Sequence, residues 1–160
     1  MIIGIDNGLD GGLCAISAHD GSIIDKLPMP TYKVKKKREV DTRSIQLWIM
    51  ALNTPFAIAI EEPLKHARSS QAMRSMSISF GKIVGMAESR NFELARIEVK
   101  DWQTALLGKT PKGHTKIAAL KVAKKLAPDE NWLATSRCKT PHDGMIDAFL
   151  IAKFYLTNRK

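Results

Sequence analysis

The chain has 160 residues, of which 44% are hydrophobic and 26% are charged, a balance typical of one globular domain (1–160) and not of a disordered segment. Lys and Arg outnumber Asp and Glu by 25 to 16, and the formal net charge of +9 indicates a polyanionic partner, nucleic acid before an anionic membrane surface. The two cysteines form no CxxC pair or Cys/His cluster, which argues against zinc, and no apolar run reaches the roughly 20 residues of a membrane span. We therefore expect a soluble, cytoplasmic protein that does not bind a membrane.

The first quarter of the chain predicts three short strands joined by tight turns. Residues 1–6 (MIIGID) form an apolar run typical of a strand buried on both faces, and a glycine-rich turn follows. Residues 13–18 and 22–27 predict two further strands of an antiparallel meander. The segment 28–40 is rich in proline and then strongly basic, so we expect it to be an exposed loop.

Helices and strands alternate in the rest of the chain. Asp41 or Thr42 can cap a helix that ends near residue 52. Apolar patterns then predict strands at 56–60 and 93–99, and helices at 71–90, 100–107, 114–126 and 142–157. An antiparallel meander followed by alternating units predicts an α/β fold with a mixed sheet of five strands covered by helices.

Acidic residues stand at the ends of three predicted elements. Asp6 ends the first strand, Glu61 ends the fourth, and Asp143 and Asp147 lie one turn apart near the start of the last helix. If the two strands are parallel neighbours, all four carboxylates meet beyond their carboxyl ends and repel one another unless cations neutralise them. Oxygen ligands suit Mg²⁺ or Mn²⁺, and two such ions form a clamp for phosphodiester hydrolysis. With the positive net charge, this set predicts a nuclease.

Each acid also has a simpler interpretation. Asp6 can be a turn-forming residue, and Glu61 and the neighbouring Glu62 can be solvated acids at the start of a loop. Asp143 can be an acid at a helix start that the helix dipole favours. Asp147 is harder to explain in this way, because it interrupts the apolar stretch GMIDAFLIA on a helix face that should pack. The order and spacing of the four acids together favour the site.

Five segments in chain order resemble one family. GIDNGLDGG, AIAIEEP, SISFGKIVG, WQTALLG and HDGMIDAFLIA make the chain similar to the RuvC Holliday-junction resolvases, particularly their compact phage-type members, over essentially its full length. The resemblance implies a ribonuclease H-like fold. It also implies a homodimer that uses Mg²⁺ to nick two opposed strands of a four-way DNA junction.

The resemblance also implies roles for particular acids. Asp6 matches the acid of the first strand, and Asp147 matches the final acid. Glu61 matches the acid in the middle of the chain, with Glu62 as the less favoured alternative.

The chain departs from the family at three places, two of which concern candidate site residues. Some members carry the remaining active-site group three residues before the final acid, where this chain has Gly144. Asp143 or His142 then takes that role, and we prefer Asp143 because an i, i+4 spacing still faces the same way. The family also often has a lysine at or beside the position of Trp102, and its other basic position maps to Lys116.

Three basic stretches are candidates for phosphate contacts, which supply affinity without sequence information. Each can equally be a solvated surface. The candidate DNA-binding residues are Lys35, Lys36, Lys37 and Arg38 in the first stretch, Lys65, Arg68 and Arg74 in the second, and Lys109, Lys112 and Lys116 in the third. The helix predicted at 71–90 carries small residues beside apolar ones, and the resemblance favours it as the two-fold dimer interface.

Three classes of function remain to be compared. The first is a Mg²⁺-dependent, structure-selective DNA endonuclease, specific for four-way junctions or acting more broadly on forks and flaps. The second is a protein that binds branched DNA without cutting it, although no acidic position is plainly missing. The third, a sugar-kinase or actin-like ATPase lobe, is disfavoured because the chain has no second glycine-rich phosphate loop.

Overall fold

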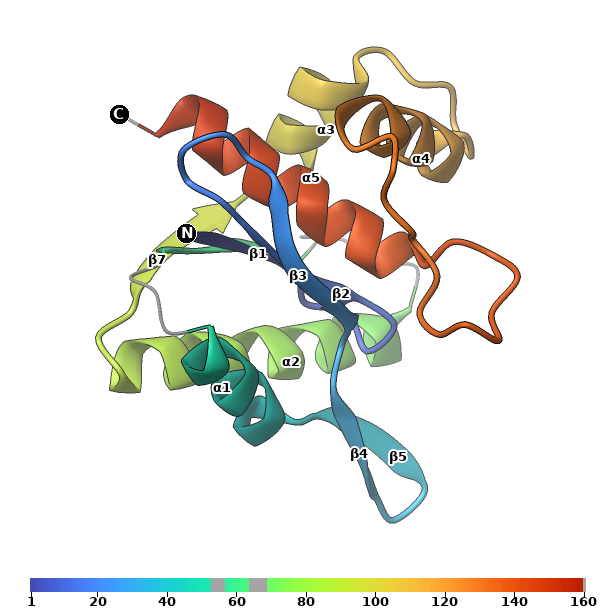
Figure 1. Ribbon diagram of the computed structural model, residues 1–160. Coiled ribbons are helices and arrows are strands. Elements are labelled where there is room, and N and C mark those ends of the chain that lie inside the picture. Colours follow the sequence, from blue (N-terminus) through green and yellow to red (C-terminus); the bar gives the residue numbers. More distant parts are fainter. Residues whose placement is uncertain (53–56, 64–68, 160) are drawn as a thin grey trace.

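A five-stranded mixed sheet forms the centre of the protein (Figure 1). The computed structural model describes residues 1–52, 57–63 and 69–159. The strands are β1 (Ile2–Asp6), β2 (Gly12–Ile16), β3 (Ile23–Pro28), β6 (Ala57–Glu61) and β7 (Glu93–Ile97), in the spatial order β3-β2-β1-β6-β7. Strands β1 to β3 are antiparallel neighbours, whereas β6 runs parallel to both β1 and β7. The predicted mixed α/β sheet is thereby confirmed.

Helices cover both faces of the sheet (Figure 1). The helices are α1 (Thr42–Ala51), α2 (Ser70–Ser89), α3 (Val99–Leu107), α4 (Thr115–Leu126) and α5 (Asp143–Asn158). Helix α5 packs on one face with α3 and α4 behind it, while α1 and α2 pack on the other. Among the residues described, no helix combines the length and the apolar character that a membrane span requires.

The alternation of side chains along β1 builds two separate cores. Ile2 belongs to the core under α5, whereas Ile3 and Ile5 belong to the core under α1 and α2. In the parallel neighbour β6, Ala59 and Ile60 divide in the same way. Successive residues of a strand point to opposite faces, so Asp6 and Glu61, two residues beyond Gly4 and Ala59, point to the face covered by α5.

The segment 28–40 is not the exposed loop that the sequence predicts. It contains a two-stranded hairpin of β4 (Thr31–Val34) and β5 (Lys37–Val40), which lies outside the main sheet. The turn between the strands contains Lys35 with a φ of 55°, a conformation usually supplied by glycine or asparagine. The absence of those residues explains why the sequence carries no hairpin signal here.

Candidate active site

Asp6 and Glu61 end neighbouring parallel strands. The last paired residues of β1 and β6 are Ile5 and Ile60, and the two acids follow directly after them. Both are only partly exposed. The side chain of Asn7 joins the two strand ends from the other side, because its Nδ2 donates a hydrogen bond to the backbone carbonyl of Glu61. The strand ends are therefore held together by backbone pairing and by one buried amide.

Glycines let α5 approach the sheet closely enough to reach these acids. A Cβ added to Gly4 would lie 1.9 Å from the backbone oxygen of Ala148, so only glycine fits under the helix. At the start of α5, Gly144 pairs with Gly11 of the β1–β2 turn in an isolated bridge. A Cβ added to Gly144 would lie 2.4 Å from the Cα of Gly11. The departure from the family pattern at position 144 thus has a physical reason: this approach leaves no room for a side chain.

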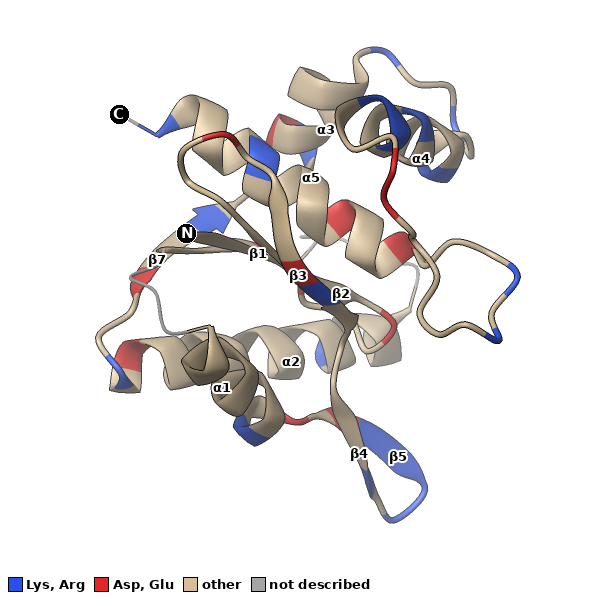
Figure 2. Ribbon diagram, viewed as in Figure 1, with Lys and Arg blue, Asp and Glu red and all other residues tan. Residues whose placement is uncertain are grey.

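Asp143 and Asp147 lie on the first two turns of α5, on the face turned toward the strand ends. Figure 2 shows acidic residues at the N-terminal end of this helix. Asp147 lies close enough to Asp6 and to Asp143 for both carboxyls to raise its pKa. His142 is the N-cap residue of α5, where its Nδ1 accepts a hydrogen bond from the backbone N–H of Met145 at 3.3 Å. The structure therefore brings Asp6, Glu61 and Asp147 together, and Asp143 lies one helical turn from Asp147 at the edge of this cluster.

Burial and mutual repulsion raise the pKa of the carboxyls in this cluster. Burial is the main cause for Glu61, whose pKa rises to about 8, and the neighbouring Asp6 adds to the effect. The pKa of Asp147 rises to about 7 for the same two reasons. Burial also raises the pKa of Asp6, although a hydrogen bond from the backbone N–H of Gly8 opposes this. The ionised cluster is therefore costly to the fold unless positive charge is present.

Trp102 is a functional candidate that the sequence does not reveal. Its indole is fully buried, and its Nε1 donates a 2.7 Å hydrogen bond to Oε2 of Glu61. From the sequence it marks only the place of a missing family lysine, because a tryptophan in a helix is usually explained as core. The contact can be recognised only once α3 is packed beside β6.

Lys116 lies at the edge of the same cluster. Its Nζ is 2.5 Å from Oδ2 of Asp143, and its charge also interacts with Asp147 and Asp6. Glu62 does not join the cluster: it follows Glu61 on the opposite face, and its backbone N–H donates to the carbonyl of Ile97.

The other predicted DNA-binding residues occupy two further regions. Lys35, Lys36, Lys37 and Arg38 are exposed on the β4–β5 hairpin, which Figure 2 shows as strongly basic, and Arg74 is exposed on α2. Lys109 and Lys112 lie between α3 and α4, at an open cavity that Lys109 lines. Lys65 and Arg68 lie outside the described residues.

The acidic cluster suits a hard divalent cation by the chemistry of its ligands. As the side chains stand, no group of three or more His, Cys, Asp and Glu residues in the described ranges is arranged to hold a metal ion. The donors are carboxylate oxygens alone, the set that Mg²⁺ and Mn²⁺ prefer. Three of these carboxyls have raised pKa values because they are buried beside one another, and a divalent cation would relieve that repulsion. The residues present therefore fit such an ion.

Comparison with solved structures gives a clear structural likeness. The chain superposes on a Thermus thermophilus RuvC in complex with a Holliday junction substrate with a TM-score of 0.64, at 13% identity, covering 96% of this chain and 91% of that one. For a second Thermus thermophilus RuvC structure the TM-score is 0.58, at 13% identity, covering 98% and 95%. No protein-family model and no curated protein sequence matches the chain. The protein has the RuvC-type, ribonuclease H-like α/β fold that the sequence predicts.

Proposed function

We propose, from the RuvC-type fold, that this protein is a Mg²⁺-dependent, structure-selective DNA endonuclease that resolves four-way junctions by paired nicks. The observation that carries the proposal is the buried cluster of carboxyls at the ends of β1 and β6 and the start of α5. The net charge of +9 supports a polyanionic substrate. Mn²⁺ is expected to replace Mg²⁺, because both accept oxygen ligands.

Asp6, Glu61, Asp143 and Asp147 would hold two metal ions in this proposal. Bound Mg²⁺ would supply the charge that makes water a nucleophile and stabilises the leaving 3′ oxygen. Asp143 is preferred over His142 for the fourth position, because the ring of His142 already caps α5 through Nδ1. Glu62 is not assigned a role, since it points away from the cluster.

Two further side chains would prepare the site. Trp102 is a positioning residue: its hydrogen bond holds one carboxylate oxygen of Glu61 and leaves the other for a cation. Lys116 pairs with Asp143 at the exposed edge, where its ammonium group can meet a phosphate of the substrate.

Two opposed nicks in one junction require two sites, so we propose a homodimer. Helix α2 offers an exposed face for this contact. A Cβ added to Gly81 or Gly85 would meet nothing within 4 Å. A two-fold axis along this face would give the isologous interface that most homodimers use.

The test is cleavage of a synthetic four-way junction in Mg²⁺, with linear duplex as the substrate control. Asp6→Asn is expected to remove cleavage by about 10²-fold or more and to keep the fold, because it removes a buried charge. Asp129→Asn makes the same chemical change at an exposed position outside the cluster and should cut like the wild type. Cleavage by a pure Asp6→Asn sample at the wild-type rate would contradict the proposal.

Two other outcomes would redirect the proposal. Equal cutting of junctions, forks and flaps would indicate a broader branched-DNA endonuclease. Tight junction binding without cutting in either Mg²⁺ or Mn²⁺ would indicate a binding protein that keeps the fold but not the reaction.

A further inference from the structure

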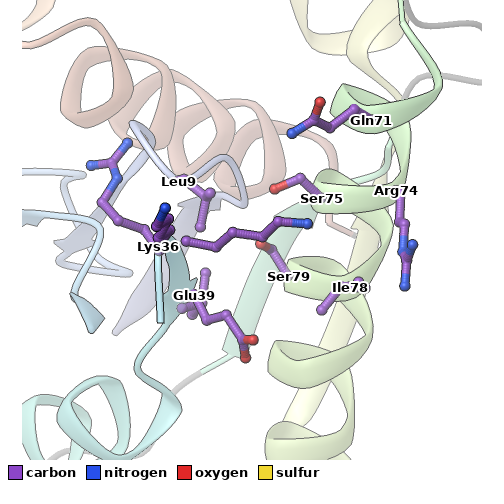
Figure 3. Close-up of a pocket in the computed structure, with 11 residues that line it drawn as sticks. Leu9, Lys36, Glu39, Gln71, Arg74, Ser75, Ile78 and Ser79 are labelled. Atoms are coloured by element: carbon purple, nitrogen blue, oxygen red, sulfur yellow. The ribbon is translucent and has the colours of Figure 1, made fainter. Parts of the chain in front are cut away.

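A basic cleft lies between the β4–β5 hairpin and the N-terminal half of α2 (Figure 3). Its volume is about 450 Å³. The hairpin contributes Lys36, Lys37 and Arg38 to one wall, and α2 contributes Arg74 to the other. We call this region the hairpin cleft. It is separate from the acidic cluster, none of whose residues lines it.

The positive charge of the hairpin cleft is only partly neutralised. Among the described residues, Glu39 is the one acid that lines it, and Oε2 of Glu39 is 2.8 Å from Nζ of Lys82. Arg38 is paired with Asp10 at 2.5 Å. Within the described part of the chain, Lys36, Lys37 and Arg74 have no acidic partner. Three cations are therefore available to a ligand.

The remaining lining combines polar side chains with the apolar Leu9, Val40 and Ile78, and its polar part suits a phosphate backbone. Gln71, Ser75 and Ser79 place polar side chains along the helical wall, as Figure 3 shows. In the ranges that the structure describes, no aromatic side chain lines the cleft, so these residues offer no platform for unstacked bases. Cations with short polar donors between them are the groups that contact phosphate oxygens in nucleic-acid complexes.

Both walls are fixed before any ligand binds. Val40, at the end of the hairpin, is buried in the core under α1 and α2. Lys82 of α2 donates to the hydroxyl of Tyr32 at 3.1 Å as well as to Glu39, so it ties the hairpin to the helix. A site whose walls are already ordered loses less conformational entropy on binding.

The hairpin cleft and the acidic cluster share the β1–β2 turn, residues 7–11. Leu9 of this turn lines the cleft, and Asp10 pairs with Arg38 of the hairpin. On the other side of the same turn, Gly11 contacts Gly144 at the start of α5. A polyanion lying in the cleft would therefore pass beside the candidate active site.

We propose that the hairpin cleft binds the phosphodiester backbone of a duplex DNA arm next to the strand that is cut. This inference rests on the proposed function and gives the substrate a second, sequence-independent contact. The site would neutralise phosphates through Lys36, Lys37 and Arg74, with Gln71 and Ser75 as hydrogen-bond donors. These phosphate contacts do not recognise the branch point of a junction. The hairpin cleft should therefore bind a linear duplex as well as an arm of a junction.

The test measures the salt dependence of DNA binding in a chelating buffer, where cleavage does not interfere. The double variant Lys36→Gln/Arg74→Gln removes two of the free cations. It is expected to weaken binding about tenfold at low salt and to reduce the slope of log K against log salt by about two, for junction and linear duplex alike. The variant Lys36→Arg/Arg74→Lys keeps the charge and should bind like the wild type.

The matched control is Arg43→Gln/Lys124→Gln. It removes the same two residue types at exposed positions on α1 and α4, outside the hairpin cleft, and should leave the slope unchanged. Equal slopes for the cleft variant and this control would overturn the cleft proposal alone. If the cleft variant shows the predicted smaller slope but the wild-type protein cuts no DNA, the nuclease proposal is overturned and the cleft proposal is supported. A wild-type protein that binds no DNA would overturn both.

Discussion

The acidic cluster and the hairpin cleft lie on two sides of the β1–β2 turn, and different kinds of contact place their functional groups. In the acidic cluster, backbone approaches through Gly4, Gly11 and Gly144 bring α5 onto the strand ends. In the hairpin cleft, exposed side chains on a small hairpin are held by ion pairs such as Lys82–Glu39 and Arg38–Asp10.

This difference predicts how each region responds to mutation. Backbone contacts in a packed core cannot relax around an added atom, so a side chain added at these glycines should disrupt the acidic cluster together with the fold. Exposed ion pairs contribute little to stability, so the hairpin cleft should lose single charges while the fold persists. The following predictions test this contrast, from the largest expected effect to the smallest.

Gly144→Ala should have the largest effect, because the new Cβ would collide with the backbone of Gly11. We expect a loss of about 3 kcal/mol or more in the free energy of unfolding, since neither backbone can move away. Chemical denaturation measures it. Gly85→Ala makes the same change on the exposed face of α2, where nothing lies within 4 Å, and should gain up to about 1 kcal/mol from helix propensity. Equal changes in the free energy of unfolding for Gly144→Ala and Gly85→Ala would contradict the proposed difference between packed and exposed positions.

The metal-free protein should become less stable as the pH rises. Glu61 and Asp147 have pKa values raised to about 8 and about 7, so the native state keeps protons that the unfolded state has already released. The contribution of these two groups to stability is therefore full below about pH 4 and is lost toward about pH 8, by an amount of the order of a few kcal/mol.

Thermal unfolding in a chelating buffer from pH 5 to pH 8 measures this loss. Mg²⁺ should restore stability at the upper end, because it favours the ionised carboxylates. Glu61→Gln should flatten the pH dependence, whereas the exposed Asp129→Asn should leave it unchanged. The same slope in both variants would show that the cluster does not cause it.

Trp102→Phe should reduce cleavage about tenfold and weaken stabilisation by Mg²⁺, because Glu61 loses its orienting hydrogen bond. Trp132→Phe is the matched control. Trp132 is also buried, but within the described residues its Nε1 has no hydrogen-bond partner. Both variants lose ring volume, and only the first loses a contact to the acidic cluster. Equal cleavage and equal Mg²⁺ response in the two would remove Trp102 from the site.

Lys82→Met should have the smallest effect on overall stability, less than about 1 kcal/mol, because its ion pair with Glu39 is partly exposed. The local effect should be larger, since Lys82 also holds Tyr32. Hydrogen exchange of the β4–β5 amides should accelerate while that of β1 does not. Unchanged exchange in the hairpin would show that other contacts hold the cleft in place.

Local patterns in the sequence predicted most of the fold. Apolar runs identified the five strands of the sheet. Of the two predicted helix caps, Asp41 and Thr42, the structure selects Asp41, whose side chain accepts hydrogen bonds from the N–H groups of Arg43 and Ser44 at 3.1 Å. Asp6, Glu61 and Asp143 were proposed because each stands at the end of an element, and Asp147 because it interrupts an apolar stretch of a helix. These patterns depend only on neighbouring residues along the chain, so they can be recognised in the sequence before the fold is known.

The features that the sequence did not reveal depend on partners far along the chain. Trp102 meets Glu61 across 41 positions, and Lys82 meets Glu39 across 43. The basic run at 33–38 indicated only an exposed loop, because its turn lacks glycine and asparagine. The hairpin forms nevertheless, since Val40 is buried at its base and Lys82 holds it against α2.

The sequence by itself determined the types, order and spacing of the acids and the strands and helices that carry them, because periodicity and turn chemistry are local. Only the tertiary structure decided that α5 approaches β1 closely enough for Asp147 to meet Asp6, since that depends on backbone contact between Gly4 and Ala148. It also decided that Gly144 is a packing residue and not a lost ligand. A close approach between segments that are far apart in the chain produces no periodic pattern in the sequence, so it can be seen only in the folded structure.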